Sequence, residues 1–269
     1  MSKIKDKIED EKEFANKETE ASEPKDEYRF SEKGHRHELL VDDEWKSLTG
    51  CTTILGVIAK PMLIQWSANM AVEYINENLS LNIFSDPVRF QELLKEAKTA
   101  HRRKKEEAGQ KGTDIHSEVE KLVASVIGAW GGIIDKDTKS EFPQVQHFIN
   151  WAVENKVKFL ETEKGLYSKS LFLGGIVDLL FEIEGEVWVG DIKTGSGIYP
   201  EHFAQMAGYE LMLKEMGFDR EIKGHIVLNL KKDGTFQEKR SVSTEDAKNF
   251  FLACVSVYRL QEKFNNQII

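Results

Sequence analysis

The sequence predicts an α/β fold, with a central mixed β-sheet flanked by helices and a helical N-terminal region. Two runs rich in Val, Ile, Leu, Phe and Trp, residues 175–183 and 186–192, surround the turn sequence Glu-Gly-Glu and predict a β-hairpin. A segment of good helix formers begins at Pro200 and stops before Gly217. Strands combined with helices in this way predict a sheet covered by helices.

The N-terminal segment differs in composition from the rest of the chain. Residues 1–28 contain ten acidic residues against six lysines and no arginine, which predicts a disordered acidic tail over residues 1–27. Such a tail can recruit a protein partner from replication or recombination, or it can be solvated and inert. Residues 28–58 then contain three short strand-like segments, YRFS, HELLVD and CTTILGVI.

The middle of the chain is expected to be mainly helical over residues 60–128. The sequence FSDPVRF interrupts it, and there Ser85 or Asp86 can cap the next helix ahead of Pro87. A further helix is expected at about residues 143–156. The sequence VKFLETEKGLYSKS predicts a strand that leads into the hairpin.

The C-terminal part predicts a strand near residues 222–230, a turn at KKDGT and a last helix from Ser243 to about residue 263. We therefore expect a strand-and-helix region over residues 28–130 that packs on a core over residues 131–269. Together these two regions are expected to form one structural unit.

Charged residues inside the predicted hairpin raise a question of chemistry. Asp178, Asp191 and Lys193 lie within or at the end of apolar runs, where an uncompensated charge costs several kcal/mol. Alternation along a strand sends Asp191 and Lys193 to one face, and pairing of the strands brings Asp178 near Asp191. Two adjacent carboxylates repel each other unless a cation lies between them. A structural Asp-Lys pair at a strand end is the alternative interpretation.

The predicted helix after the hairpin adds an amide and a phenol. Gln205 and Tyr209 are four residues apart and share one helix face, at the end nearer Asp191 and Lys193. They can face the carboxylates, although such residues are also common on an ordinary amphipathic helix.

Four short motifs follow one another along the chain: His116 within KGTDIHSEVEKLV, Gly175-x-x-Asp178, Asp191-x-Lys193 and Gln205-x-x-x-Tyr209. Their order and spacing resemble the RecB-like branch of the PD-(D/E)XK nuclease superfamily, which includes phage exonucleases, mitochondrial genome maintenance exonucleases and CRISPR-associated adaptation nucleases. The likeness covers roughly residues 110–230 and implies a restriction-endonuclease-like core. Residues 28–110 resemble relatives more loosely.

The resemblance implies a divalent metal site. Its ligands would be His116, Asp178, Asp191 and the backbone carbonyl of Ile192, a mostly oxygen set that suits Mg²⁺ or Mn²⁺. Lys193 would orient the attacking water or stabilise developing negative charge during phosphodiester hydrolysis. His116 alone, near a helix start, is also compatible with a solvated or hydrogen-bonded histidine.

The resemblance assigns three further residues supporting roles. Gln205 would help to hold the nucleophile or phosphate, and Tyr209 would brace Lys193 or the DNA backbone. Glu163 lies in the predicted strand before the hairpin, at a distance from Asp178 that matches an acidic position of some relatives, and is a candidate ligand of a second metal. Glu161 would share its strand face, so the sequence leaves open which of the two points inward.

The net charge of −9 is unusual for a DNA enzyme, because phosphate binding depends on Lys and Arg. Residues 95–112 nevertheless contain seven Lys or Arg against three Glu, immediately before His116. This basic segment is a candidate DNA-binding helix; a solvated helix face with internal ion pairs is the alternative. Its candidate contacts are Arg102, Arg103, Lys104, Lys105 and Lys111.

Composition limits the setting of the protein. The two cysteines, Cys51 and Cys254, suit a reducing compartment and exclude both a disulfide framework and the four-cysteine iron-sulfur cluster of several relatives. Without a membrane-spanning window or secretory signal, a cytoplasmic location in a bacterial or phage-infected cell is expected.

The resulting expectation is a Mg²⁺- or Mn²⁺-dependent DNA exonuclease that acts on single-stranded ends in replication, recombination or repair. One alternative is a structure-specific endonuclease or resolvase, because the same core serves both activities. The other is a nuclease-fold module that binds nucleic acid or protein without cutting.

Overall fold

The computed structural model describes residues 27–267, apart from the side chains of residues 81, 82, 108 and 111. The predicted acidic tail therefore lies outside the described residues, except for Glu27. By their contacts the described residues group into two compact units, which divide between Ser47 and Leu48. The predicted division at residues 130 and 131 stays a prediction.

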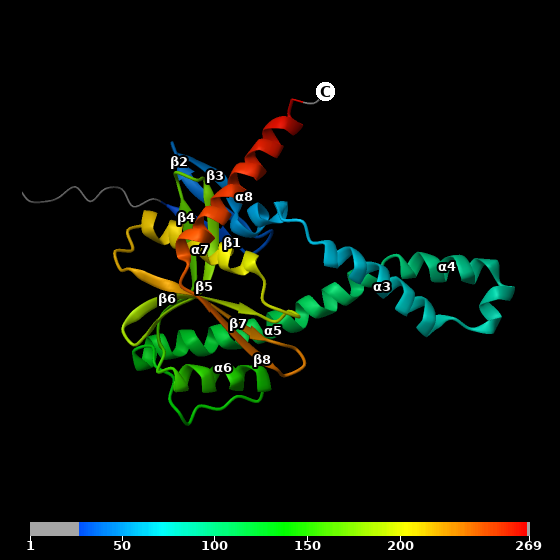
Figure 1. Ribbon diagram of the computed structural model, residues 1–269, viewed down its shortest axis with the longest axis horizontal. Coiled ribbons are helices and arrows are strands. Elements are labelled where there is room, and N and C mark those ends of the chain that lie inside the picture. Colours follow the sequence, from blue (N-terminus) through cyan, green and yellow to red (C-terminus); the bar gives the residue numbers. More distant parts are fainter. Residues whose placement is uncertain (1–26, 268–269) are drawn as a thin grey trace, which may run out of the picture. The chain divides into compact units, whose positions relative to one another are not determined.

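The described residues form eight strands and seven α-helices, with two short 3₁₀ turns (Figure 1). The strands are β1 (Tyr28–Ser31), β2 (Arg36–Val41), β3 (Glu44–Gly50), β4 (Lys158–Ser168), β5 (Leu173–Ile183), β6 (Glu186–Lys193), β7 (Ile222–Leu230) and β8 (Phe236–Ser241). The helices are α2 (Cys51–Ile54), α3 (Pro61–Asn78), α4 (Pro87–Ala97), α5 (Ala100–Trp130), α6 (Pro143–Glu154), α7 (Pro200–Glu215) and α8 (Thr244–Asn265), and the 3₁₀ turns are η1 (Leu55–Val57) and η2 (Leu81–Ser85).

The strands make a mixed sheet, so the predicted α/β class is confirmed. Its order is β1-β2-β3-β5-β6-β7-β8, with β4 paired to β5 outside this path. The β4–β5, β5–β6 and β7–β8 pairs are antiparallel, whereas β6–β7 and β3–β5 are parallel. Parallel pairing of β6 with β7 requires the crossover through α7, which returns the chain along one face of the sheet.

Helices cover both faces of the sheet in the larger unit. Alternation along β6 sends Trp188 and Ile192 into the core beneath α5 and α6, and sends Val187 and Val189 into the core beneath α7 and α8. Asp191 and Lys193 have odd numbers like the two valines, so their side chains face α7. The Asp191–Lys193 part of the predicted site therefore lies on this face, whereas His116 comes from α5, which covers the opposite face.

Most predicted elements agree with the structure. The hairpin turns at Glu184 and Gly185, both with positive φ, and the helices after residues 86, 143, 200 and 243 form as expected. Of the two candidate caps, Asp86 caps α4, because its carboxylate accepts hydrogen bonds from the backbone N–H groups of Val88 and Arg89.

Three segments differ from the sequence-based expectation. CTTILGVI was predicted as a strand, but it forms α2 and η1, because Cys51, Ile54 and Leu55 are spaced as one helical face and are buried against α7 and α8. Strands β3 and β8 were missed. Their mixed polar sequences, EWKSLTG and FQEKRS, carry no strong apolar alternation.

Among the described residues, no helix has both the length and the apolar character needed to cross a membrane.

Candidate metal centre and active site

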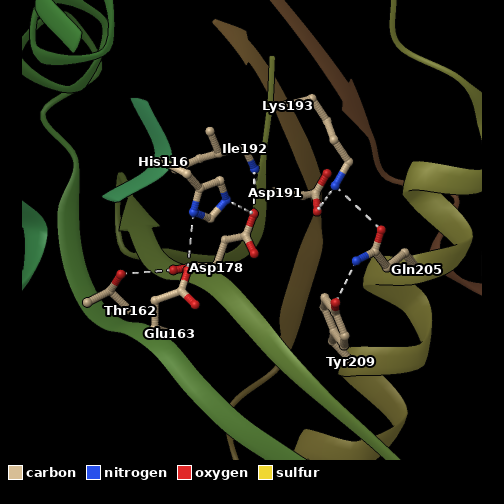
Figure 2. A network of polar contacts seen from close by, with 9 residues as sticks. All are labelled: His116, Thr162, Glu163, Asp178, Asp191, Ile192, Lys193, Gln205 and Tyr209. Carbon is tan, nitrogen blue, oxygen red and sulfur yellow. Dashed lines mark hydrogen bonds and ion pairs between the residues drawn. The ribbon is translucent and has the colours of Figure 1, made fainter. Parts of the chain in front are cut away.

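An imidazole and two carboxylates meet where α5 crosses β4 and β5 (Figure 2). His116 Nε2 is hydrogen-bonded to Asp178 Oδ2 at 3.0 Å, and His116 Nδ1 lies 3.5 Å from Glu163 Oε1. One possible ligand atom from each of the three residues lies within 4.8 Å of the others. Three elements far apart in sequence thus supply one compact group of metal-ligand type.

Close packing brings α5 to this position. Gly112 lies one turn before His116, and a Cβ at this glycine would be 2.5 Å from the Thr194 hydroxyl oxygen, just beyond β6. The absence of a side chain at Gly112 therefore lets α5 approach the end of β6. His116 is then carried to the carboxylates.

Irregular backbone in β4 and β5 aims the two carboxylates. Glu163 has a φ of +46°, which a non-glycine residue rarely adopts within a strand. On β5, Val177 packs in the core beneath α7, whereas Leu179, two residues on, packs in the opposite core. The regular alternation of side chains between the two faces of the sheet is therefore interrupted at Glu163 and Asp178. Strained backbone of this kind concentrates at functional sites.

Asp178 also connects β5 to β6. The antiparallel ladder ends at the Leu179–Gly190 pair, and beyond it the backbone N–H of Ile192 donates to Asp178 Oδ2 at 2.8 Å. The same register, continued by one residue, places Asp178 opposite Asp191. The predicted approach of the two aspartates is consistent with this arrangement.

Lys193 links Asp191 to α7. Its Nζ donates to Asp191 Oδ1 at 2.6 Å and lies 3.5 Å from Gln205 Oε1, and Gln205 Nε2 donates to the Tyr209 hydroxyl at 2.5 Å. Asp191 is fully buried, whereas the Lys193 side chain is 25% exposed. The ammonium therefore lies between the protein interior and solvent.

The buried aspartates differ in their affinity for protons. Burial raises the pKa of Asp191 to about 6, against the opposing charge of Lys193 and with a contribution from Asp178. Burial also acts to raise the pKa of Asp178, but the hydrogen bond and charge of His116 outweigh it and lower that pKa below its usual value. Of these two aspartates, Asp178 is therefore the one that stays ionised to lower pH.

The other members of the site show the effect of concentrated negative charge. Burial disfavours protonated His116, yet the hydrogen bond with Asp178 and the nearby carboxylates raise the pKa of His116 to about 9. Burial and the charge of Asp178 raise the pKa of Glu163 to about 7. His116 is therefore protonated at neutral pH, and coordination to a metal would require it to lose this proton.

The donor set fits a hard divalent cation. The Glu163 and Asp178 carboxylates and the His116 imidazole are ligands of the kind that Mg²⁺ and Mn²⁺ accept. Asp191 is not a member of this group. Within the described residues, the buried Asp191 Oδ2 has no hydrogen-bond partner. A buried carboxylate oxygen without a partner is costly, and coordination to a cation would satisfy it.

The structure gathers eight of the predicted site residues into one network: His116, Glu163, Asp178, Asp191, Ile192, Lys193, Gln205 and Tyr209. It also separates Glu163 from Glu161, whose carboxylate lies 2.5 Å from Lys164 Nζ outside this network.

The candidate DNA contacts lie apart from this network, in the N-terminal half of α5. Arg102, Lys104 and Lys105 are exposed there. Arg103 is engaged within the helical region, because its guanidinium lies 4.8 Å from the centre of the Tyr74 ring and donates to the Glu96 carbonyl. The side chain of Lys111 lies outside the described residues.

Sequence reasoning missed Asn229, a polar neighbour of the site. In the parallel β6–β7 pair, Asn229 is the register partner of Lys193, so both side chains leave the same face of the sheet. Asn229 is fully buried, and its side-chain oxygen and nitrogen have no partner among the described residues. A single polar residue in the apolar run IVLNL was the available signal.

Sequence reasoning also missed Thr162 and His202. The Thr162 hydroxyl donates to the backbone carbonyl of Asp178 at 3.0 Å and so ties β4 to β5 beside the site. Burial and the charge of Lys193 lower the pKa of His202 to about 4, so this histidine is neutral near the ammonium.

Gly175 provides a test of how tightly Tyr209 is held. A Cβ at this position would lie 2.7 Å from Tyr209 Cε1 and 3.0 Å from Met212 Cε. We expect Gly175→Ala to destabilise the protein by about 1–3 kcal/mol through overpacking. The control is Gly109→Ala on α5, where no atom lies within 4 Å of the added Cβ. Denaturant unfolding of both variants checks this expectation, and unchanged stability of Gly175→Ala would show that Tyr209 is not fixed.

Comparison with known proteins gives no independent assignment, because no family model and no curated protein sequence matches the chain.

Proposed function

We propose that the protein is a metal-dependent deoxyribonuclease that hydrolyses phosphodiester bonds from single-stranded DNA ends. The observation that carries this proposal is the placement of the His116, Glu163 and Asp178 group beside the Asp191–Lys193 ion pair. A metal-ligand cluster next to a partly exposed ammonium combines the two groups that phosphodiester hydrolysis requires.

The residues divide into metal ligands and groups that act on the substrate. His116, Asp178, Asp191 and the Ile192 carbonyl would hold Mg²⁺ or Mn²⁺, and Glu163 would complete this set or hold a second ion. Bound there, a divalent ion would lower the pKa of a bound water and neutralise charge on the scissile phosphate.

Lys193 is suited to act on the reacting phosphate. The charges of Asp191 and Asp178 outweigh the effect of burial and raise the pKa of Lys193, so its side chain stays an ammonium at neutral pH. It can therefore orient the attacking water or stabilise negative charge that develops on the phosphate oxygens.

Gln205 and Tyr209 hold the ammonium from the α7 side. Burial raises the pKa of Tyr209 well above its ordinary value, so the phenol stays neutral and keeps its proton. It accepts from the Gln205 amide, which fixes the amide oxygen toward Lys193. These two residues would position Lys193 without changing its charge.

The α5 helix offers a path for DNA to this site. An α-helix advances 100° per residue, so positions 102 and 105 lie on the same side of α5 as His116, within about 40°. Arg102 and Lys105 are both exposed. Lys105 is eleven residues from His116, which corresponds to roughly 17 Å along the helix axis. We infer that a single strand bound along this side is guided to the metal ligands.

The proposal predicts cleavage that requires both a divalent metal and a DNA end. The test compares end-labelled linear single strands with closed circular single strands, with Mg²⁺, Mn²⁺ or chelator present. We expect processive loss of the linear strand with either metal, an intact circle, and no cleavage with chelator.

Each alternative activity gives a different result. Circles cut as fast as linear strands would replace the exonuclease with an endonuclease, and preferential cutting of branched duplexes would indicate a resolvase. Binding of DNA without cleavage under any metal condition would leave a non-cleaving binding module.

A further inference from the structure

The last helix, α8, has a second apolar face besides the one packed in the protein core. Phe251, Cys254 and Val255 are buried in the core beneath α7 and α8. A separate row of apolar residues follows the same helix at alternating spacings of three and four residues. The members of this apolar stripe, all exposed, are Phe250, Ala253, Val257, Leu260 and Phe264.

The C-terminal half of α8 has little packing of its own. From Ser256 to Asn265 every residue except Tyr258 is exposed. A helix segment of this length is marginal in water without tertiary packing. Leu260 is 53% exposed and Phe264 is 58% exposed, so the largest apolar side chains of the stripe are among the least covered.

The spacing of the apolar stripe indicates the kind of partner. Apolar residues at alternating spacings of three and four form the narrow seam that packs against a second helix in a coiled coil. Exposed residues beside the seam include Asn249, Ser256 and Gln261, which carry no charge. Two copies of this seam can therefore approach without repulsion between like charges.

We propose that the apolar stripe of α8 is a docking surface for a second copy of this chain, with the two helices antiparallel about a twofold axis. Centred on residue 255, this register pairs Val257 with Ala253 of the second copy and Leu260 with Phe250 of the second copy. The same twofold rotation generates both pairs, so the surface is complementary to itself, as a twofold interface requires.

The same register provides a site for Phe264. This residue falls opposite Asp246 of the second copy, beside a groove of about 460 Å³. Apolar side chains of Ile198, Phe203 and Phe250 line the groove. Lys263 arrives next to the exposed carboxylate of Asp246, which adds an opposite-charge contact at each end of the helix pair.

A seam of about four helical turns buries less than the roughly 800 Å² per partner of a standard interface. We therefore expect a reversible dimer whose population rises with protein concentration. The proposal does not depend on the nuclease assignment, because its readout is the association state of the full chain.

The test is sedimentation equilibrium of the full chain over a wide concentration range, with matched Val→Glu variants. Val257→Glu places a charge in the seam, and we expect it to weaken self-association by more than roughly tenfold. Val72→Glu on α3, at a position 57% exposed, is the control and should associate like the wild type. Leu260→Ser removes an exposed apolar side chain of the same seam without adding a charge. We expect this variant to be folded by circular dichroism and to self-associate less than the wild type, so that the conclusion does not depend on correct folding of Val257→Glu alone.

Disulfide formation tests the register. Chains carrying Ala253→Cys and chains carrying Val257→Cys should crosslink when mixed, and each alone should crosslink much less. Self-crosslinking of Leu260→Cys would indicate parallel helices and overturn the proposed arrangement.

Two further results would overturn the proposal itself. One is a wild-type chain that stays monomeric at every concentration. If a chain without residues 1–26 then associates, the N-terminal segment and not a second copy covers the stripe in the full chain. The other is a dimer that Val257→Glu leaves unchanged.

Discussion

Asp191→Ala is expected to weaken both metal binding and DNA cleavage strongly, whereas Lys193→Ala is expected to impair cleavage alone. Asp191 has one oxygen paired with Lys193 and one that has no hydrogen-bond partner among residues 27–267, so its removal takes away a carboxylate available to a cation. Loss of a residue that only hydrogen-bonds to a metal ligand costs roughly 10–100-fold in metal affinity. Because Asp191 would be a ligand itself, we expect Mn²⁺ affinity to fall by at least this factor.

Lys193→Ala should behave differently because the ammonium competes with a metal for Asp191. Its removal frees Asp191 Oδ1, so Mn²⁺ affinity should be unchanged or higher. Cleavage should fall by roughly 10²–10³-fold, as for loss of one group that stabilises transition-state charge. Calorimetric titration with Mn²⁺ and single-turnover cleavage separate these two effects.

Folding needs its own control, because Asp191 is fully buried and Lys193→Ala leaves it without a cation. Removing one member of a buried ion pair costs about 3–5 kcal/mol. Lys193→Arg retains the charge but not the shape of the ammonium, and should fold normally and cleave slowly. Equal loss of Mn²⁺ affinity in Asp191→Ala and Lys193→Arg would contradict the assigned roles.

Strong apolar patterns made much of the fold predictable. The β5–β6 hairpin and α7 carry long runs of their characteristic periods, and their ends are marked by glycine or proline. Strand β8 was not predictable in the same way. Its residues Glu238 and Arg240 bond to side chains of α6 and its C-terminal cap, Trp151 and Asn155, so the strand depends on tertiary partners and not on its own apolar period.

The candidate site was predictable as a set of residues but not as a geometry. Motif spacing singled out the residues from His116 to Tyr209 that the structure brings together. Alternation could not choose between Glu161 and Glu163, because the positive φ at Glu163 breaks the period of two. Asn229 was out of reach because its nearness to Lys193 depends on the β6–β7 register, which is a long-range property.

The basic segment shows how structure sharpens a hypothesis based on charge. The sequence offered Arg102, Arg103, Lys104 and Lys105 as equivalent contacts. In the structure Arg103 packs on Tyr74, and Lys104 lies beside a cavity between α3 and α5. Only Arg102 and Lys105 of these four share the side of α5 that carries His116. The set of basic residues that would guide DNA is therefore smaller than the whole basic segment.

The double variant Arg102→Ala/Lys105→Ala is accordingly expected to weaken single-strand binding. The slope of the logarithm of the binding constant against the logarithm of the salt concentration should become shallower by about 0.7 for each phosphate that is no longer neutralised, and so by up to about 1.4 for both residues. The matched control is Lys104→Ala/Lys121→Ala, which removes the same charge from other sides of α5. Fluorescence anisotropy with a labelled single strand at several salt concentrations measures both slopes.

The substrate length separates guidance from chemistry. Lys105 lies roughly 17 Å along the helix from His116, beyond the reach of a dinucleotide-scale substrate bound at the metal ligands. Cleavage of such a substrate should therefore be nearly unchanged in Arg102→Ala/Lys105→Ala, while cleavage of long strands slows. If both double variants have the wild-type slope, Arg102 and Lys105 belong to a solvated helix face. If both flatten the slope equally, DNA responds to the total charge of α5 and not to the side that leads to His116.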